Sequence, residues 1–294
     1  MNNKAKGALL VMGAGFLWGT AGIVAKAVYS MTNVGPISLA LYRLIFAVPL
    51  LALYAVLKGY RFSVTHHELY LFAAFGFCSL TAFEALYLTS IKYTTVQHAT
   101  ALLYTAPAFV AVLSSSILKE HLTRNKLVAV AMSVLGAFLI VGFARGVPPF
   151  AGRTQIGDWL AISSGLAYSS WYIFGKILGK DREPAVIATL GMCFGALFLT
   201  PLTFFTEGLT PPNSLLAWGL VAEVGLVPTA SAYMLYLGGL KLIEATRASV
   251  FAIVEPLSAS VLAFLFLHET FTYDSFFGLV LIISSIVLIS SAGT

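Results

Sequence analysis

Two stretches of this sequence decide its fold: YLTSIKYTTVQHATALLYTAP at residues 87–107 and YLGGLKLIEATRASVFAIVEP at residues 236–256. They align without a gap at a shift of 149 residues, and the match runs on through Glu120 and Glu269 to Thr123 and Thr272. Nearer the N-terminus the match continues at a shift of 150 residues, and the small changes in shift are loop insertions. The chain is therefore a tandem repeat of about 150 residues.

The composition is that of an integral membrane protein. Of the 294 residues, 59% are hydrophobic and 10% are charged, whereas soluble domains are about half apolar and about a quarter charged. A helix needs roughly 20 apolar residues to cross a hydrocarbon core of about 30 Å. The sequence predicts an all-α membrane protein with ten transmembrane helices: 7–29, 36–58, 68–90, 95–118, 125–143, 156–178, 184–206, 215–240, 246–267 and 274–292.

The basic residues predict the orientation of these helices. With the N-terminus placed in the cytoplasm, twelve of the 17 Lys and Arg residues fall on the cytoplasmic side and four on the outer side. Cytoplasmic loops of membrane proteins carry an excess of Lys and Arg. We therefore expect both termini in the cytoplasm, with the first apolar stretch retained as a helix rather than removed as a signal peptide.

The repeat places five helices in each half, with the first repeat at residues 1–146 and the second at 154–294. Because five is an odd number, the second repeat must enter the membrane from the opposite side. Inverted repeats of this kind are typical of transporters, whose substrate site lies between the two halves. Each copy is expected to supply the moving helices on its own side of the membrane.

Polar groups within the spans are the candidate site residues, because a charge at a helix centre costs about 2.5–3.5 kcal/mol. Glu84 in the third span is either a cavity carboxylate that meets a substrate ammonium group or a structural partner for Arg43. In the fourth span His98 and Tyr104 share a helical face, and they either line a polar cavity or pack within the bundle.

Aromatic residues give a second set of candidates. Trp18 and Tyr168 lie near mid-span and correspond across the repeat, and Trp171 follows on the same helix as Tyr168. These rings either line the cavity or form the interface belt. Tyr87 and Tyr236, at the ends of the third and eighth spans, are interpreted as membrane-surface anchors. The loop residues Glu120 and Glu269 are expected to cap a helix or pair with cations rather than bind substrate.

Prolines near the middle of the fourth and ninth spans are the candidate gating residues. Proline removes the hydrogen bond to the carbonyl four residues back, which predicts a kink at Pro107 and another at Pro256. Glu255 precedes Pro256, whereas Ala106 precedes Pro107, so the two kinks cannot be chemically equivalent. A kink with an adjacent carboxylate is a plausible gate.

These features together resemble the EamA-type branch of the drug/metabolite transporter superfamily. The resemblance rests on the two five-helix halves, the prolines at 107 and 256, and the closing LKEHLT and LHETFT motifs. It implies a carrier that exports small metabolites across the bacterial inner membrane. Within the family the chain is most similar to the aromatic amino acid exporters, which implies aromatic and other neutral amino acids as cargo in a central cavity between the repeats.

Several alternatives remain open at the level of sequence. The same scaffold could carry other metabolites or drugs, and a channel is also compatible with ten spans. A membrane-embedded enzyme would need paired catalytic residues, for which Glu84 and His98 are the candidate couple. No metal motif, nucleotide-binding loop or nucleic-acid site is recognised, so no cofactor is expected. The expected partners are a small-molecule substrate and the lipid bilayer, with no obligatory protein partner.

Overall fold

The computed structural model describes residues 2–94, 96–141, 155–267 and 273–291, although the side chains of 96–98 and 263 are outside the description. Throughout these described ranges the regular structure is helical, and no strand is present. The first half contains α1 (Asn3–Met31), α2 (Pro36–Leu57), α3 (His66–Gly76), the π-helical segment η1 (Phe77–Ala82), α4 (Phe83–Tyr93), α5 (Val96–Leu103), α6 (Ala106–Ile117) and α7 (Arg124–Val141).

The second half repeats this order of elements. It contains α8 (Gln155–Leu178), α9 (Pro184–Thr206), α10 (Leu215–Val224), the π-helical segment η4 (Gly225–Ser231), α11 (Ala232–Leu240), α12 (Ala245–Ala252), α13 (Val254–Leu267) and α14 (Tyr273–Ser291). The all-helical class predicted from the sequence is confirmed.

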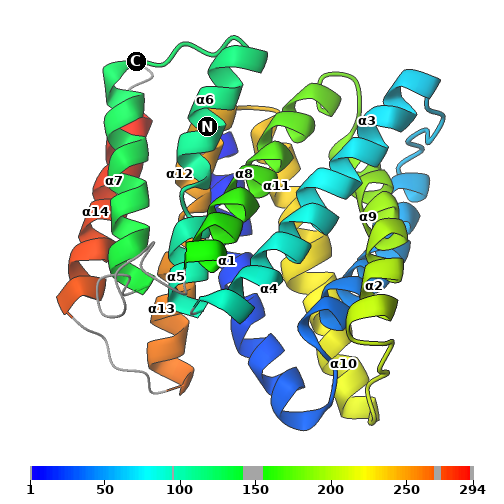
Figure 1. The fold of residues 1–294 in the computed structure, drawn as a ribbon. Coiled ribbons are helices and arrows are strands. Elements are labelled where there is room, and N and C mark those ends of the chain that lie inside the picture. Colours follow the sequence, from blue (N-terminus) through cyan, green and yellow to red (C-terminus); the bar gives the residue numbers. More distant parts are fainter. Residues whose placement is uncertain (1, 95, 142–154, 268–272, 292–294) are drawn as a thin grey trace.

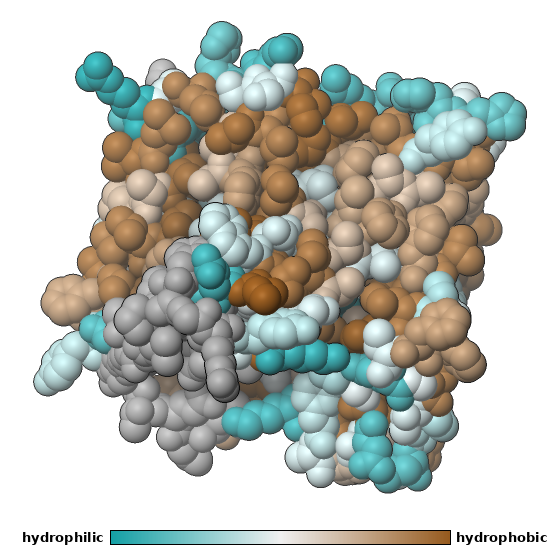
Figure 2. Space-filling view, viewed as in Figure 1, coloured by the Kyte–Doolittle hydropathy of each residue, from teal (hydrophilic) through white to brown (hydrophobic). Residues whose placement is uncertain are grey.

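Among the described residues, eight helical segments are long and apolar enough to span a membrane. Two of them contain the π-helical segments and two contain the proline breaks, while α7 and α8 occupy the two remaining predicted spans. In the space-filling view, apolar side chains form a broad band across the molecule and polar side chains gather at both ends (Figure 2). This band matches the surface that a lipid bilayer requires.

The two halves interlock with opposite orientation (Figure 1). The start of α1 and the end of α14 lie at one end of the molecule, which we call the termini face; the other end is the opposite face. Helix α8, the counterpart of α1, runs toward the termini face, whereas α1 runs away from it. Corresponding helices of the two halves pack against each other: α7 contacts α14, and α2 contacts α9. The contact of α1 with α11 is likewise repeated by the contact of α8, the counterpart of α1, with α4, the counterpart of α11.

Local sequence signals explain where the long helices begin. Pro36 and Pro184 start α2 and α9, positions where a missing N–H costs nothing. Thr65 begins α3 with a capping box in which its side chain accepts from the Glu68 backbone N–H. Beyond these signals, tight packing of the buried faces positions the helices around a shared core.

The fourth and ninth spans are broken rather than merely kinked. The first break separates α5 from α6 around residues 103–106, and the second separates α12 from α13 at residue 253. Each break lies against a glycine of the other half. A Cβ on Gly165 would lie 3.0 Å from the Leu103 carbonyl oxygen, and one on Gly15 would lie 2.9 Å from the Ala252 carbonyl oxygen. Only glycine lets the helices approach this closely.

Candidate functional site

A central cavity of about 230 Å³ lies between the two halves. Its walls come from α1, α2, α4, α5, α8, η4, α11 and α13, so both repeats contribute. Five of the candidate site and gating residues line it: Trp18, Glu84, Tyr104, Tyr168 and Glu255. The arrangement brings the charged and aromatic candidates together at one place in the membrane interior.

Glu84 and Arg43 form an ion pair across the cavity wall. The Arg43 Nη2 group donates to Glu84 Oε1, which joins α2 to α4. The two side chains are 23% and 10% exposed, so both charges are largely removed from water. Glu84 therefore pairs with Arg43, as one of the two readings expected, and it also lines the cavity, while its contact with a substrate stays a prediction.

The π-helical segment η1 sets the direction in which Glu84 points. A π segment adds one residue to a turn and so rotates everything that follows around the helix axis. Glu84 is the second residue of α4, directly after this segment. In the second half η4 precedes α11 in the same way, and the counterpart of Glu84 is Tyr233, which also lines the cavity. The extra residues are therefore part of how both repeats build the site.

Glu255 lies at the start of α13, directly after the break in the ninth span. Among the residues that the structure describes, none bonds or pairs with its carboxylate. With Glu84 and Arg43, it is one of three charged groups that the described residues place on the cavity wall. Two carboxylates and one guanidinium give this part of the cavity an excess of acidic groups.

Aromatic rings make up much of the remaining wall. Trp18 packs edge-on against Tyr233 with ring centroids 5.2 Å apart, and its Nε1 group has no hydrogen-bond partner. Phe83 and Tyr168 lie opposite, with centroids 5.2 Å apart. Rings of this kind suit an apolar or cationic group, since the face of an aromatic ring attracts both.

Trp171 lies behind this wall rather than on it. Its ring is 1% exposed and stacks on Phe75 with centroids 4.3 Å apart. It also packs edge-on against Tyr233, at a centroid separation of 4.4 Å. The structure therefore places Trp171 as a support for a cavity residue. The side chain of His98 is outside the described residues.

The prolines lie at the two helix breaks. Pro107 is the second residue of α6 and lines a small cavity of about 10 Å³, which also contacts Tyr104, Tyr172 and Glu255. Pro256 is the third residue of α13 and is buried. Where the sequence predicts a kink at each proline, the structure has a break in the helix.

The interpretation of two tyrosines as membrane-surface anchors is wrong. Tyr87 lines the cavity and bonds with the Thr100 hydroxyl at 2.8 Å, and Tyr236 is fully buried between the halves. Tyr233 is a cavity residue that the polar and aromatic patterns of the sequence do not point to. The signal that could have found it is the repeat itself, because the shift of 149 residues carries Glu84 onto Tyr233.

The described residues contain no group of three or more His, Cys, Asp or Glu side chains that could hold a metal ion. The residues that line the cavity offer ion pairing, hydrogen bonding and ring stacking.

Comparisons with known proteins identify a family and several relatives. The model of the EamA-like transporter family matches residues 5–142 and 155–291. A Salmonella typhimurium protein named "Uncharacterized inner membrane transporter YicL" is 27% identical, over 99% of this chain and 97% of its own length. "Uncharacterized transporter YwfM" of Bacillus subtilis is 26% identical, over 97% of this chain and 93% of its own length.

A solved crystal structure shows the same fold. It superposes with a TM-score of 0.84 at 15% identity, over 97% of this chain and 98% of its own. The family model covers nearly the whole described chain, once in each repeat. The chain therefore belongs to the EamA-like transporter family and is a multi-pass membrane transporter.

Proposed function

We propose that this transporter exports amino acids, aromatic and other neutral ones, through the central cavity by alternating access. The observation that carries the proposal is the wall of the cavity, which combines one guanidinium, two carboxylates and several aromatic rings. An amino acid offers a carboxylate, an ammonium group and a side chain, and each of these finds a complementary partner on this wall.

Arg43 is the proposed partner of the cargo carboxylate. Its Nη2 group is engaged by Glu84, but a guanidinium has five N–H donors, and the Nε group has no hydrogen-bond partner. Glu255, which no described residue pairs, is the proposed partner of the ammonium group. Trp18 and Tyr168 would contact the cargo side chain. His98 remains a candidate for this site on the sequence alone, whereas Trp171 would act through Tyr233, against which its ring packs.

The size of the cavity supports a small cargo. Pockets for drug-sized ligands usually enclose about 300–1,000 Å³, and this cavity encloses about 230 Å³. Pro107, Glu255 and Pro256 are the proposed gating residues, because each lies at a break where one part of a span can pivot against the other. The termini face is the proposed cytoplasmic face, as the distribution of Lys and Arg predicts.

Organic cations are the second candidate cargo. Two carboxylates outnumber the one guanidinium, and the surrounding rings can hold a quaternary ammonium by cation–π contact. This alternative keeps the fold and the cavity but changes the role of Arg43 from a partner of cargo to a partner of Glu84.

The test is uptake of radiolabelled phenylalanine, threonine and methionine into proteoliposomes that contain the purified protein. Saturable uptake above that of empty liposomes, lost in Glu255→Gln, supports the proposal. The matched control is Glu183→Gln, since Glu183 is a carboxylate on the termini face that is 49% exposed and pairs with Lys241. Transport of labelled tetraethylammonium with none of the amino acids would favour the second candidate.

A further inference from the structure

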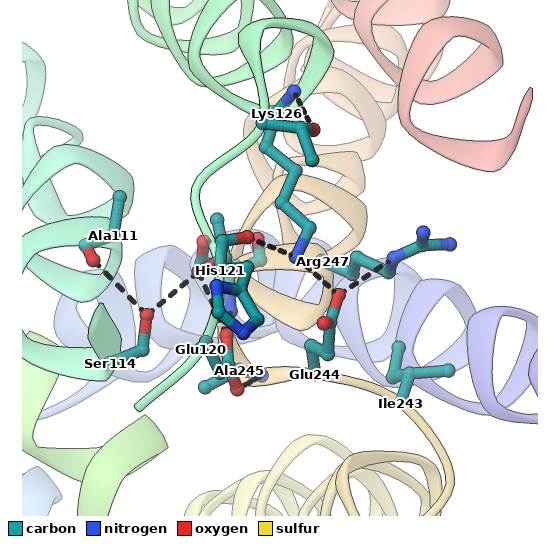
Figure 3. A network of polar contacts seen from close by, with 12 residues as sticks. Ala111, Ser114, Glu120, His121, Lys126, Ile243, Glu244, Ala245 and Arg247 are labelled. Carbon is teal, nitrogen blue, oxygen red and sulfur yellow. Dashed lines mark hydrogen bonds and ion pairs between the residues drawn. The ribbon is translucent and has the colours of Figure 1, made fainter. Parts of the chain in front are cut away.

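The start of α12 is held by a carboxylate from the other half of the molecule. Glu120, in the connection after α6, accepts hydrogen bonds from the backbone N–H groups of Ala245 at 2.6 Å and Thr246 at 3.2 Å. The Thr246 hydroxyl donates to the same carboxylate at 3.0 Å. The expectation that Glu120 caps a helix is therefore confirmed, with the addition that the helix belongs to the second repeat (Figure 3).

A chain of charges continues from this cap. The Lys126 Nζ group lies 2.8 Å from Glu244 and donates to the His121 carbonyl at 2.7 Å. Glu244 also pairs with Arg247 at 3.0 Å. Lys126 is 3% exposed and comes from the first repeat, whereas Glu244 and Arg247 come from the second. Figure 3 shows Lys126 and Arg247 reaching Glu244 from two sides.

These contacts close the termini face between the repeats. The Ser114 and Thr246 hydroxyls are also bonded at 2.8 Å, deep between α6 and α12. We call Glu120, Lys126, Glu244, Thr246 and Arg247 the polar lock. Within the described ranges, α12 packs against α6 and α7, while the mirror-image packing of α5 against α13 and α14 is not developed to the same extent. Among the described residues, the contact between the repeats at the termini face is therefore more extensive than its mirror image.

The sequence carries the same asymmetry. At the shift of 149 residues, Glu120 has a counterpart in Glu269, so the capping carboxylate is present in both repeats. The other three charged residues of the lock have no counterpart of the same kind. Lys126 corresponds to Ser275, Glu244 to Thr95 and Arg247 to His98. A lock built at the opposite face from these counterparts would keep a carboxylate but would lack the Lys–Glu–Arg chain.

We propose that the polar lock is the gate of the termini face and that its one-sided chemistry makes the state closed at this face the resting state of the transporter. This proposal rests on the alternating-access mechanism proposed above. It adds that the state closed at the termini face is the more populated one. Charge-assisted hydrogen bonds are shorter and about twice as strong as neutral ones. The polar lock forms these hydrogen bonds only in the state that is closed at the termini face. It therefore increases the population of that state relative to the state that is open there.

The test measures access to each face and needs no transported cargo. A cysteine at Ser114 reports opening of the termini face, because Ser114 is fully buried at the contact between α6 and α12. A cysteine at Ala21, which lines the central cavity, reports access from the opposite face. Each reporter is placed in a Cys78→Ser/Cys193→Ser background, and its labelling by a charged thiol reagent is timed in nanodiscs.

The lock is then broken by Glu244→Gln, which removes the carboxylate shared by both cations. We expect labelling at position 114 to become about tenfold faster or more, and labelling at position 21 to become slower, as the population moves to the other state. Lys126→Met should act in the same direction, whereas Lys126→Arg should keep the slow rate because it retains the charge. The control is Glu183→Gln, whose ion pair with Lys241 lies within one repeat.

Two results would overturn the proposal. Unchanged labelling at position 114 in both Glu244→Gln and Lys126→Met would show that the lock does not hold the face closed. Faster labelling at position 114 without slower labelling at position 21 would show local fraying rather than a change of state. A folded protein with normal labelling and no amino acid uptake would count against the proposed cargo and leave the lock intact, so the two failures are distinguishable.

Discussion

The two helix breaks use the same backbone geometry and different chemistry. In both, a proline follows the break and a glycine of the other repeat lies against the last carbonyl of the preceding helix. The residue before the proline is Ala106 in the first repeat and Glu255 in the second. The comparison shows that the two repeats share the proline and the facing glycine of each break. They differ at the residue before the proline, and this difference places a charge in the cavity.

The largest loss of stability is expected when one member of the Arg43–Glu84 ion pair is removed. Arg43→Met removes the guanidinium and leaves Glu84 largely buried and unpaired. Breaking a buried pair in this way costs about 3–5 kcal/mol. We expect a strongly lowered melting temperature in detergent, followed by fluorescence, together with loss of transport.

The double variant Arg43→Met/Glu84→Met separates these two effects. It removes both charges and should recover much of the lost stability, because replacing a buried pair by apolar residues is often neutral. It should not recover transport. A double variant as unstable as Arg43→Met would mean that the pair is not the source of the loss.

The next largest effect is on transport, and it distinguishes the two helix breaks. Glu255→Gln should lower transport by about tenfold to a hundredfold, as expected for a lost charge-assisted hydrogen bond of about 1.5–3 kcal/mol. Its melting temperature should change little, because no described residue pairs with the carboxylate. Ala106→Gln is the matched change at the other break, and equal losses of transport in both would contradict the asymmetry.

Substitution of the glycine that faces each break should lower stability by a similar amount, since both breaks have the same backbone contact. Gly15→Ala and Gly165→Ala each place a methyl group about 3 Å from a carbonyl oxygen of the facing break. Overpacking of this kind costs about 1–3 kcal/mol. Thermal unfolding should show similar destabilisation for both variants, and a large change in only one of them would break the equivalence of the two contacts.

The smallest effect concerns pH at the polar lock. Burial tends to raise the pKa of Glu244, but Lys126 and Arg247 outweigh it and hold this pKa below its ordinary value. A lowered folded-state pKa contributes stability above the unfolded value of about 4.3, and this is lost as the pH falls through the folded value. For a partly exposed pair we expect up to about 1 kcal/mol.

This pH effect can be measured as faster labelling at position 114 below pH 4 than at pH 7, after correction for the reactivity of the thiol. Glu244→Gln should remove most of the difference. The same pH dependence in that variant would assign the effect to another group.

The fold could be predicted from the sequence because its signals are local or repeated. Apolar stretches define the spans, the prolines mark the breaks, and the shift of 149 residues relates the halves. The site was predicted less completely. Helical periodicity places Glu84 and Tyr104 among polar neighbours, but it cannot show that Arg43 reaches Glu84 from another helix.

The errors concern residues whose environment is decided by packing between repeats. Tyr87 and Tyr236 lie near helix ends, where a single span would place them at the membrane surface, yet Tyr87 lines the cavity and Tyr236 is fully buried. Trp171 shares a helix with Tyr168 but faces Phe75 rather than the cavity. No local pattern distinguishes a ring that lines a cavity from one that supports it.

The π-helical segments also affect how the sequences of relatives should be aligned. Each residue advances an α-helix by about 100°, so a relative lacking one residue within 77–82 would turn its α4 equivalent by that angle and present another face to the cavity. The same holds for 225–231 and the α11 equivalent. A single-residue gap at either place would therefore signal a different cavity wall, even where the residues at Glu84 and Tyr233 align by identity.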